Sequence, residues 1–261
     1  MADADLLLRS GDLDGARAAL VEAVRARPSD ERARMFLFQL LAVAGEWDKA
    51  KRQLAALAQL SAEAQMLSVA YGQAIDAELE RAQVLAGTAR ARQHVASPWA
   101  EGIADALQHF AFGRLVEGEA AREAAFEAAP DTPGSVDGTA FDWIADADAR
   151  FGPTFEAIIG GRYGLQAFDQ IDRIEAEGAR DLRDTVWYPA QIFFRSGQSV
   201  AAMLPARYPG SETAADAGER LGKVTSWREE AGVELGSGQR LWSLSTGDDV
   251  GLLSVRTLTF A

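Results

Sequence analysis

A six-residue pattern near the start of the chain constrains the fold more than any other feature. The stretch Gly11-Asp12-Leu13-Asp14-Gly15-Ala16 recurs 34 residues later as Gly45-Glu46-Trp47-Asp48-Lys49-Ala50. Thirty-four residues is the period of the tetratricopeptide repeat, a helical hairpin that stacks on its neighbours. The first glycine of each stretch permits a tight turn, and the alanine at its end lets two helices approach closely. The pattern therefore predicts stacked helical hairpins.

Caps and apolar spacing place the helices of these hairpins. Pro28 ends the first hairpin, and Ser29-Asp30 can cap a helix that runs from about Glu31 to Ala44. A third, looser unit begins near Ala64, and its second helix, around residues 78–86, lacks the glycine turn. We expect a further helical pair over residues 99–112 and 115–128. This half of the chain is interpreted as a short α-solenoid that becomes irregular towards its end.

The character of the sequence changes after this helical half. The segment from Ala129 to Ser135 holds two prolines and a glycine, which stop a helix. Beyond Gly138, short runs of aromatic and β-branched residues alternate with turns, as in small antiparallel sheets. One short helix is predicted after Pro153, with Thr154 as its cap. We therefore expect an α+β protein, with a tetratricopeptide-like α-solenoid over residues 1–129 and a compact β-rich, partly open barrel-like domain over residues 138–261.

Charge and composition exclude several classes of function. Acidic residues number 39 against 26 basic ones, and a net charge of −13 argues against binding to nucleic acid or to an anionic membrane surface. The absence of cysteine excludes disulfides and thiolate chemistry. The acidic start of the chain does not resemble a signal peptide, and no apolar stretch approaches the ~20 residues that span a bilayer. We expect a cytoplasmic protein whose partners carry basic surfaces.

Three clustered carboxylates, Asp142, Asp146 and Asp148, are the feature closest to an enzyme site. Such clusters can hold Mg²⁺ or Ca²⁺, which makes a metal-dependent enzyme one hypothesis. However, no calcium loop or matching distant carboxylate accompanies them. We favour hydrogen bonds of turns or caps and ion pairs with Arg150 or Arg162. Neither histidine of the chain lies in a triad-like arrangement. We therefore assign no catalytic residue, cofactor or metal ligand.

The helix expected from Glu31 to Ala44 carries apolar residues on all sides, more than its own hairpin can cover. One interpretation is that the surplus lines a concave groove that binds a partner. The candidate partner-binding residues are Arg32, Met35, Phe36 and Gln39, followed one period later by Met66, Val69 and Gln73. The alternative is that neighbouring helices of the solenoid cover this face.

Two short segments of the second half are each open to two interpretations. Asp181-Leu182-Arg183-Asp184 is either a docking edge or, as we prefer, an ion-pair turn within its own domain. Arg207-Tyr208-Pro209-Gly210 is either a recognition loop or a turn preset by its proline.

The second half also contains motifs in the order of a known family. They are Phe141-Asp142-Trp143-Ile144-Ala145-Asp146-Ala147-Asp148-Ala149-Arg150-Phe151-Gly152-Pro153, Gly161-Arg162-Tyr163, Asp181-Leu182-Arg183-Asp184 with Val186-Trp187, Leu204-Pro205-Ala206-Arg207-Tyr208-Pro209-Gly210-Ser211-Glu212, and Gly238-Gln239-Arg240. Together with the repeat-like helical half upstream, these motifs make nearly the whole chain resemble the ImpE/TagJ family.

The resemblance implies a non-enzymatic accessory protein of type VI secretion. Its implied partner is the N-terminal segment of the small sheath subunit TssB, bound in the cytoplasm, and any contact with the ClpV-type ATPase is indirect. The alternatives are a generic tetratricopeptide-like structural protein or co-chaperone and, ranked last, the metal-dependent enzyme. A co-chaperone needs a basic clamp for a partner's carboxylate, and Arg32 is nearly alone in the predicted groove.

Overall fold

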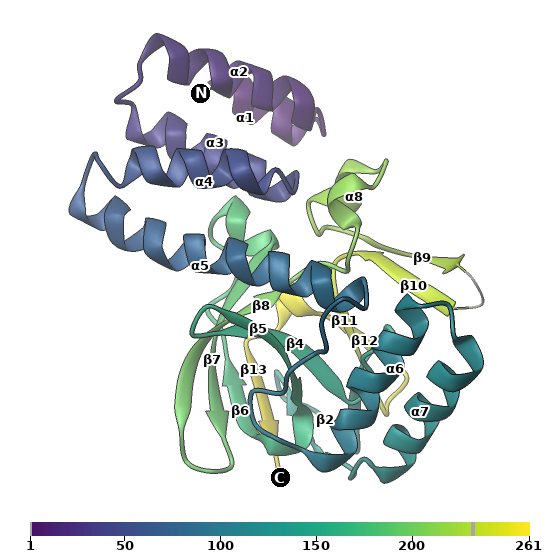
Figure 1. Ribbon diagram of the computed structural model, residues 1–261. Helices are drawn as coiled ribbons and strands as arrows, with labels where there is room; N and C mark the ends of the chain where they lie inside the picture. Colours follow the sequence, from purple (N-terminus) through teal and green to yellow (C-terminus); the bar gives the residue numbers. More distant parts are fainter. Residues whose placement is uncertain (1, 231–232) are drawn as a thin grey trace.

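The computed structural model describes residues 2–230 and 233–261 and joins a helical half to a β-rich half (Figure 1). The first five helices form a stack, and the last two of this half lie beside the sheets (Figure 1). The seven helices of the helical half are α1 (Ala2–Arg9), α2 (Leu13–Ala26), α3 (Glu31–Val43), α4 (Trp47–Leu57), α5 (Ala62–Leu85), α6 (Glu101–Ala111) and α7 (Leu115–Ala128), and the short helix α8 (Ala217–Arg220) belongs to the β-rich half. The predicted change from helices to strands after residue 129 is therefore present.

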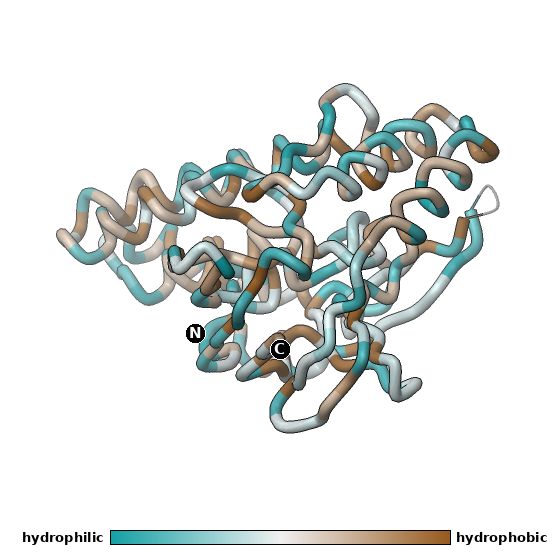
Figure 2. Tube along the Cα trace, turned by 90° about the horizontal axis from the view of Figure 1, so that it is seen from below, coloured by the Kyte–Doolittle hydropathy of each residue, from teal (hydrophilic) through white to brown (hydrophobic). Residues whose placement is uncertain are grey.

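The 34-residue pattern forms the predicted hairpins α1–α2 and α3–α4. Gly11 and Gly45 follow α1 and α3 with φ angles of +85° and +66°, the left-handed region that favours glycine. Ala16 and Ala50 are fully buried, which lets the second helix of each hairpin approach its neighbours closely. Hydrophobic and hydrophilic residues alternate along the helical tubes in Figure 2, as expected of helices with one buried face.

The third unit differs from the prediction, because α5 is one unbroken helix of 24 residues. The expected separate helix near residues 78–86 was wrong. Residues 76–79 contain neither glycine nor proline, so nothing in the sequence stops the helix there. Glu78 and Arg81 are buried on this helix, and α5 packs against both α4 and β5. None of the helices within the described residues is both long and apolar enough to cross a lipid bilayer.

The predicted pair α6–α7 is present and turns at Gly113, whose φ angle is +68°. α7 also packs on the β-rich half: a Cβ atom added to Gly152 would lie 2.2 Å from the ring of Phe126. The helical pair therefore covers part of the β-rich half instead of extending the solenoid.

The β-rich half is built from antiparallel strands. An eight-stranded sheet has the order β2-β1-β13-β6-β7-β8-β4-β5, and since β2 and β5 are its edges, it is open. Smaller sheets have the orders β12-β11-β3 and β10-β9. The strands are β1 (Gly134–Val136), β2 (Thr139–Phe141), β3 (Ile144–Asp146), β4 (Thr154–Ile159), β5 (Arg162–Ala167), β6 (Ile171–Glu175), β7 (Trp187–Phe194), β8 (Ser199–Pro205), β9 (Thr225–Glu230), β10 (Val233–Gly238), β11 (Leu241–Leu244), β12 (Asp249–Gly251) and β13 (Thr257–Phe260). The predicted α+β architecture with a β-rich second half is confirmed.

The short helix predicted after Pro153 is instead strand β4. Thr154 does not cap a helix, and its hydroxyl donates a hydrogen bond to the carbonyl of Phe151. β4 pairs with β5 over its whole length and with β8 at Ile158 and Ile159. Pairing on both sides overrides the weak capping signal, and the large apolar residues of the segment favour a strand.

The hydrophobic core crosses between the two halves. One cluster of buried residues includes side chains of α1 to α6 together with Ile158, Tyr163, Leu165 and Trp187 of the β-rich half. The indole of Trp187 is fully buried, and its ring centroid lies 5.8 Å from that of Trp47 and 5.7 Å from that of Tyr71. The division into domains at residues 1–129 and 138–261 stays a prediction, and independent folding of either part has to contend with this shared cluster.

We expect the full chain to unfold in a single transition, because separating the halves exposes Trp187 and its neighbours to water. Far-ultraviolet circular dichroism, dominated by the helices, and tryptophan fluorescence should then give the same midpoint in a thermal scan. Two resolved midpoints would show that the halves unfold independently.

Candidate functional site

A groove lined by α1, α3 and α5 collects four of the predicted partner-binding residues. Its volume is about 1020 Å³, and its lining residues are Asp5, Asp30, Glu31, Arg32, Met35, Phe36, Gln39 and Glu63. On α3, residues spaced by three or four positions share one face, which brings Arg32, Met35, Phe36 and Gln39 together. The groove thus lies on the first helices of three successive units, where the sequence predicts it.

The apolar surplus of α3 is divided between the core and this groove. Phe38 is fully buried, whereas Met35 and Phe36 are half-buried and border the groove. Gln39 is 8% exposed and Arg32 lies in solvent. The sulfur of Met35 is 3.5 Å from Nη1 of Arg183, so the β-rich half covers one side of Met35. Neither sequence interpretation is complete, because part of this face is covered and part remains open.

The groove lining is acidic, with four carboxylates and the cation of Arg32, although Asp5 pairs with Arg9 and Asp30 with Arg27 outside the lining. Two of the carboxylates also hold local structure. Asp30 caps α3 by accepting the N–H of Ala33 at 3.0 Å, and Glu31 accepts the hydroxyl of Ser61 at 3.1 Å. These contacts fix the positions of the carboxylates and retain their charge beside Met35 and Phe36. The groove therefore combines adaptable apolar side chains with a negative rim.

The three predicted residues of α5 lie outside the lining of this groove. Met66 and Val69 are exposed at 71% and 59%, which is unusual for side chains of their size and hydrophobicity. Gln73 lines a second cavity instead. The sequence therefore predicted that these residues are exposed on α5, but it did not show that Gln73 borders a different cavity from the groove of α3.

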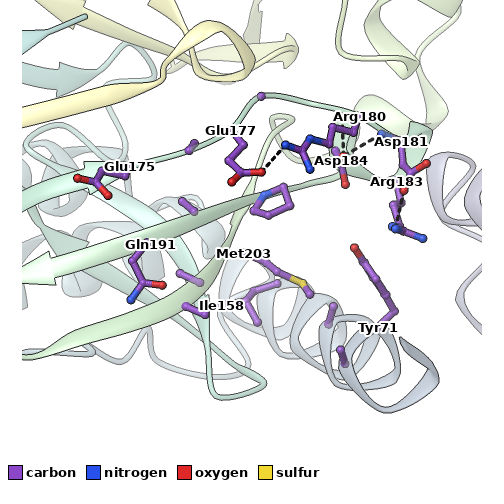
Figure 3. A pocket seen from close by; sticks show the side chains of 18 of the residues that line it. Tyr71, Ile158, Glu175, Glu177, Arg180, Asp181, Arg183, Asp184, Gln191 and Met203 are labelled. Atoms are coloured by element: carbon purple, nitrogen blue, oxygen red, sulfur yellow. Dashed lines mark hydrogen bonds and ion pairs between the residues drawn. The ribbon is translucent and has the colours of Figure 1, made fainter. Parts of the chain in front are cut away.

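The second cavity, of about 920 Å³, lies between α5, the outer face of the large sheet and the segment 175–184 (Figure 3). Its floor contains Pro189 and Gln191 of β7 and Ala201 and Met203 of β8, and Tyr71 of α5 stands at one side. In Figure 3 the ion-paired side chains of segment 175–184 lie above this floor.

The turn η3 (Leu182–Thr185) separates the two hollows. It is held by reciprocal capping of Asp181 and Asp184, and Arg183 pairs with Asp181 at 2.5 Å. The guanidinium of Arg183 also lies 4.9 Å from the ring centroid of Tyr71. The preferred interpretation of an ion-pair turn within one domain is thus incomplete, because the same turn also binds the helical half.

Comparison with known proteins matches both halves of the chain. The tetratricopeptide repeat matches residues 7–69, and the ImpE protein family matches residues 138–259. The type VI secretion system accessory component TagJ of Pseudomonas aeruginosa is 41% identical over 260 residues, which is 98% of this chain and 90% of that protein. The chain belongs to the ImpE/TagJ family. This family of type VI secretion accessory proteins is the one that the sequence motifs indicate.

A solved structure extends the ImpE/TagJ comparison to the fold. The crystal structure of protein VPA1032 from Vibrio parahaemolyticus superposes with a TM-score of 0.87 at 20% identity, covering 99% of this chain and 97% of that one. An experimentally determined structure therefore has the same arrangement of a helical half joined to an open sheet.

The ImpE/TagJ motifs meet in a buried network of charges. Arg240 pairs with both Asp146 and Glu156, and the Nε atom of Arg81 on α5 lies 2.7 Å from Glu156. The hydroxyl of Tyr163 donates to Glu156 at 2.6 Å. These five side chains are all at most 7% exposed. The network joins four strands or turns of the β-rich half to α5.

Of the three clustered carboxylates that suggested an enzyme site, two are buried in ion pairs and one is exposed. Asp142 is exposed, Asp146 is paired with Arg240, and Asp148 is fully buried and pairs with Arg150 at 2.6 Å. Arg162, the other predicted partner, pairs instead with Glu80 at 3.1 Å. Over residues 2–230 and 233–261, no group of three or more histidine or acidic side chains is arranged to hold a metal ion.

The two carboxylates bound to Arg240 differ in their acidity. Burial alone would raise the pKa of Glu156, but the charges of Arg240 and Arg81 outweigh it and lower that pKa to about 2. Burial raises the pKa of Asp146 to about 7, since Arg240 offsets it only in part and Asp148 lies nearby. Glu156 is therefore ionised at neutral pH, while Asp146 is close to its titration point.

Sequence reasoning missed Arg81 and Glu156, which connect the two halves. A signal did exist for Glu156, because it is the single charge in the run Phe155-Glu156-Ala157-Ile158-Ile159, and a charge within an apolar strand needs a buried partner. The segment Arg207-Tyr208 was open to interpretation as a recognition loop, yet both side chains are at most 5% exposed. Nη1 of Arg207 donates to the carbonyl of Val43 at 2.9 Å, so this segment also fastens the helices to the sheets.

Proposed function

We propose that the chain is a non-enzymatic, cytoplasmic adaptor of type VI secretion that binds the N-terminal segment of the small sheath subunit in the groove of α1, α3 and α5. Contact with the ClpV-type ATPase then arises only through the sheath. The proposal rests on family membership for the system and on the groove for the mode of binding.

The observation that carries the proposal is the half-buried pair Met35 and Phe36 between carboxylates. An amphipathic helix can place its apolar stripe on Met35 and Phe36, and methionine adapts its shape to such stripes. Basic residues on the flanks of the helix would face Asp5, Glu31 and Glu63, which increases the rate of association and selects against acidic partners. The chemistry of the groove thus favours an amphipathic helix with basic flanks.

The alternative functions fit these residues less well. Recognition of a partner's terminal carboxylate by a co-chaperone requires several cations, but the groove lining supplies only Arg32 against four carboxylates. A metal-dependent enzyme requires open carboxylates, but Asp146 and Asp148 are buried in ion pairs with Arg240 and Arg150. The adaptor remains the function that the groove supports best.

Replacing Phe36 by Ala should weaken binding of a synthetic peptide of the sheath subunit's N-terminal segment by about 2 kcal/mol, or roughly thirtyfold. The aromatic ring is one of the two large apolar side chains that α3 presents to the groove, so its loss removes a central contact. Isothermal titration calorimetry measures the effect, and Leu79→Ala, which removes a 43% exposed side chain from α5 outside both hollows, is the matched control.

Added salt should weaken binding to the wild-type protein as well, because the groove's carboxylates are exposed enough to be screened. Equal affinities for the Phe36→Ala and Leu79→Ala variants, both folded, would remove the binding site from this groove. Failure of the wild-type protein to bind the peptide would contradict the proposed partner itself.

A further inference from the structure

The open face of α5 connects the groove to the second cavity. Glu63 lines the groove, and Ala70 and Gln73 line the cavity. Met66 lies between them on the same stripe, since the four residues are three or four positions apart. The stripe from Glu63 to Gln73 covers about 15 Å at the rise of an α-helix. The 71% exposure of Met66 therefore falls between two hollows and not on an isolated surface.

One side chain borders both hollows. Arg183 touches Met35 of the groove, and its guanidinium lies against Tyr71 of the cavity. Arg183 pairs with Asp181 and lies over the ring of Tyr71, so the charge of its guanidinium is already compensated at this junction. Such a junction can be crossed by an apolar helix without leaving a charge buried and unpaired.

The floor of the cavity is also suited to apolar contact. Ala201 is exposed and Met203 half-buried on the outer face of β8, and Pro189 is opposite Met203 on β7. The charges of the adjoining segment are matched, as in the pair of Arg180 and Glu177 at 2.5 Å. Small side chains on a sheet leave room for the larger side chains of a partner.

We propose that the partner helix does not end in the groove of α3 but continues along Met66 and Ala70 and packs its last turns into the cavity above β7 and β8. The inference rests on the proposed function and deepens it, because it makes the β-rich half a second contact for the same basic amphipathic helix. The carboxylate of Glu63 complements a basic flank at the groove end of the path, whereas at the cavity end Glu175 pairs with Arg173 and Glu177 with Arg180, so the contact there is apolar.

The test places a bulky cation at each part of the path. Ala70→Arg on α5 and Ala201→Arg on β8 fill the stripe and the cavity with a side chain that repels a basic partner. The matched controls are Ala82→Arg on α5 and Ser199→Arg on β8, which change exposed residues outside both hollows. Circular dichroism and thermal scans establish that each variant is folded, which we expect because all four positions are exposed.

In calorimetry with the sheath-subunit peptide, Ala70→Arg and Ala201→Arg should each weaken binding about tenfold or more, whereas the controls should stay within about twofold of wild type. A peptide shortened by two turns at the end that lies over the sheet should bind Ala201→Arg and wild type equally. That result also gives the direction of the helix.

Three results would overturn the inference. If Phe36→Ala weakens binding but Ala70→Arg and Ala201→Arg behave like their controls, the proposed function stands and the extended path is wrong. If the wild-type protein does not bind the peptide, the proposed function and the path fall together. If the wild-type protein without peptide forms a dimer that Ala201→Arg dissociates, the occupant of the cavity is a second copy of this chain.

Discussion

Replacing Glu156 by Gln should lower the free energy of unfolding by about 3–5 kcal/mol, because it leaves two buried arginines with one anionic partner fewer each. Glu156 is 1% exposed and binds Arg240 of the β-rich half and Arg81 of α5. The amide of Gln keeps only one acceptor oxygen, presents an NH2 donor in place of the other, and carries no charge to balance either guanidinium. The melting temperature should therefore fall by about 10 °C in a protein of this size.

Urea unfolding of the two proteins at pH 7 measures the difference. The matched control is Glu22→Gln, whose carboxylate pairs with Arg25 at 2.6 Å with about two thirds of each side chain exposed, and which should change stability by less than about 0.5 kcal/mol. Adding Arg81→Met to Glu156→Gln should recover part of the loss, since it removes one of the two cations that have lost an anionic partner. A loss for Glu156→Gln no larger than that of the control would mean that the network does not hold the two halves together.

Local patterns predicted the helical half because each hairpin carries its own signals. Gly11 and Gly45 mark the turns, and Asp30 caps the next helix. These signals act over a few residues, so they can be recognised without knowing what packs against the helix. The continuity of α5 also has a local basis, because residues 76–79 hold no glycine or proline, whereas the burial of Glu78 and Arg81 depends on residues far along the chain.

The candidate site shows the same limit. Met35 and Phe36 border a hollow, which is one of the two arrangements that the sequence left open for the surplus apolar residues of α3. The second cavity could not be predicted, since it exists only where α5 meets the outer face of β7 and β8. Strand β4 was missed despite a local signal, since Gly160-Gly161 joins it to β5 in a two-residue hairpin; only its pairing with β8 is long-range.

Replacing Asp146, the carboxylate that shares Arg240 with Glu156, should change how the stability of the protein depends on pH. The folded-state pKa of Asp146 is about 7, above its ordinary value of 3.8, so the folded protein binds a proton there that the unfolded chain has released. The stability that this group contributes is therefore fully present below about pH 4 and is lost as the pH rises through about 7. Glu156 behaves oppositely, because its lowered pKa of about 2 makes its contribution constant at every pH above about 5.

Asp146→Asn keeps the size of the side chain and is neutral at every pH, so it resembles the protonated carboxyl. We expect its free energy of unfolding to rise relative to wild type by on the order of a few kcal/mol between pH 4.5 and pH 8. Urea unfolding of both proteins at several pH values tests this, because titrating groups that do not interact with Asp146 cancel in the difference. If the difference is independent of pH, the burial of Asp146 beside Asp148 does not outweigh its pairing with Arg240, and Asp146 is an ionised structural anion like Glu156.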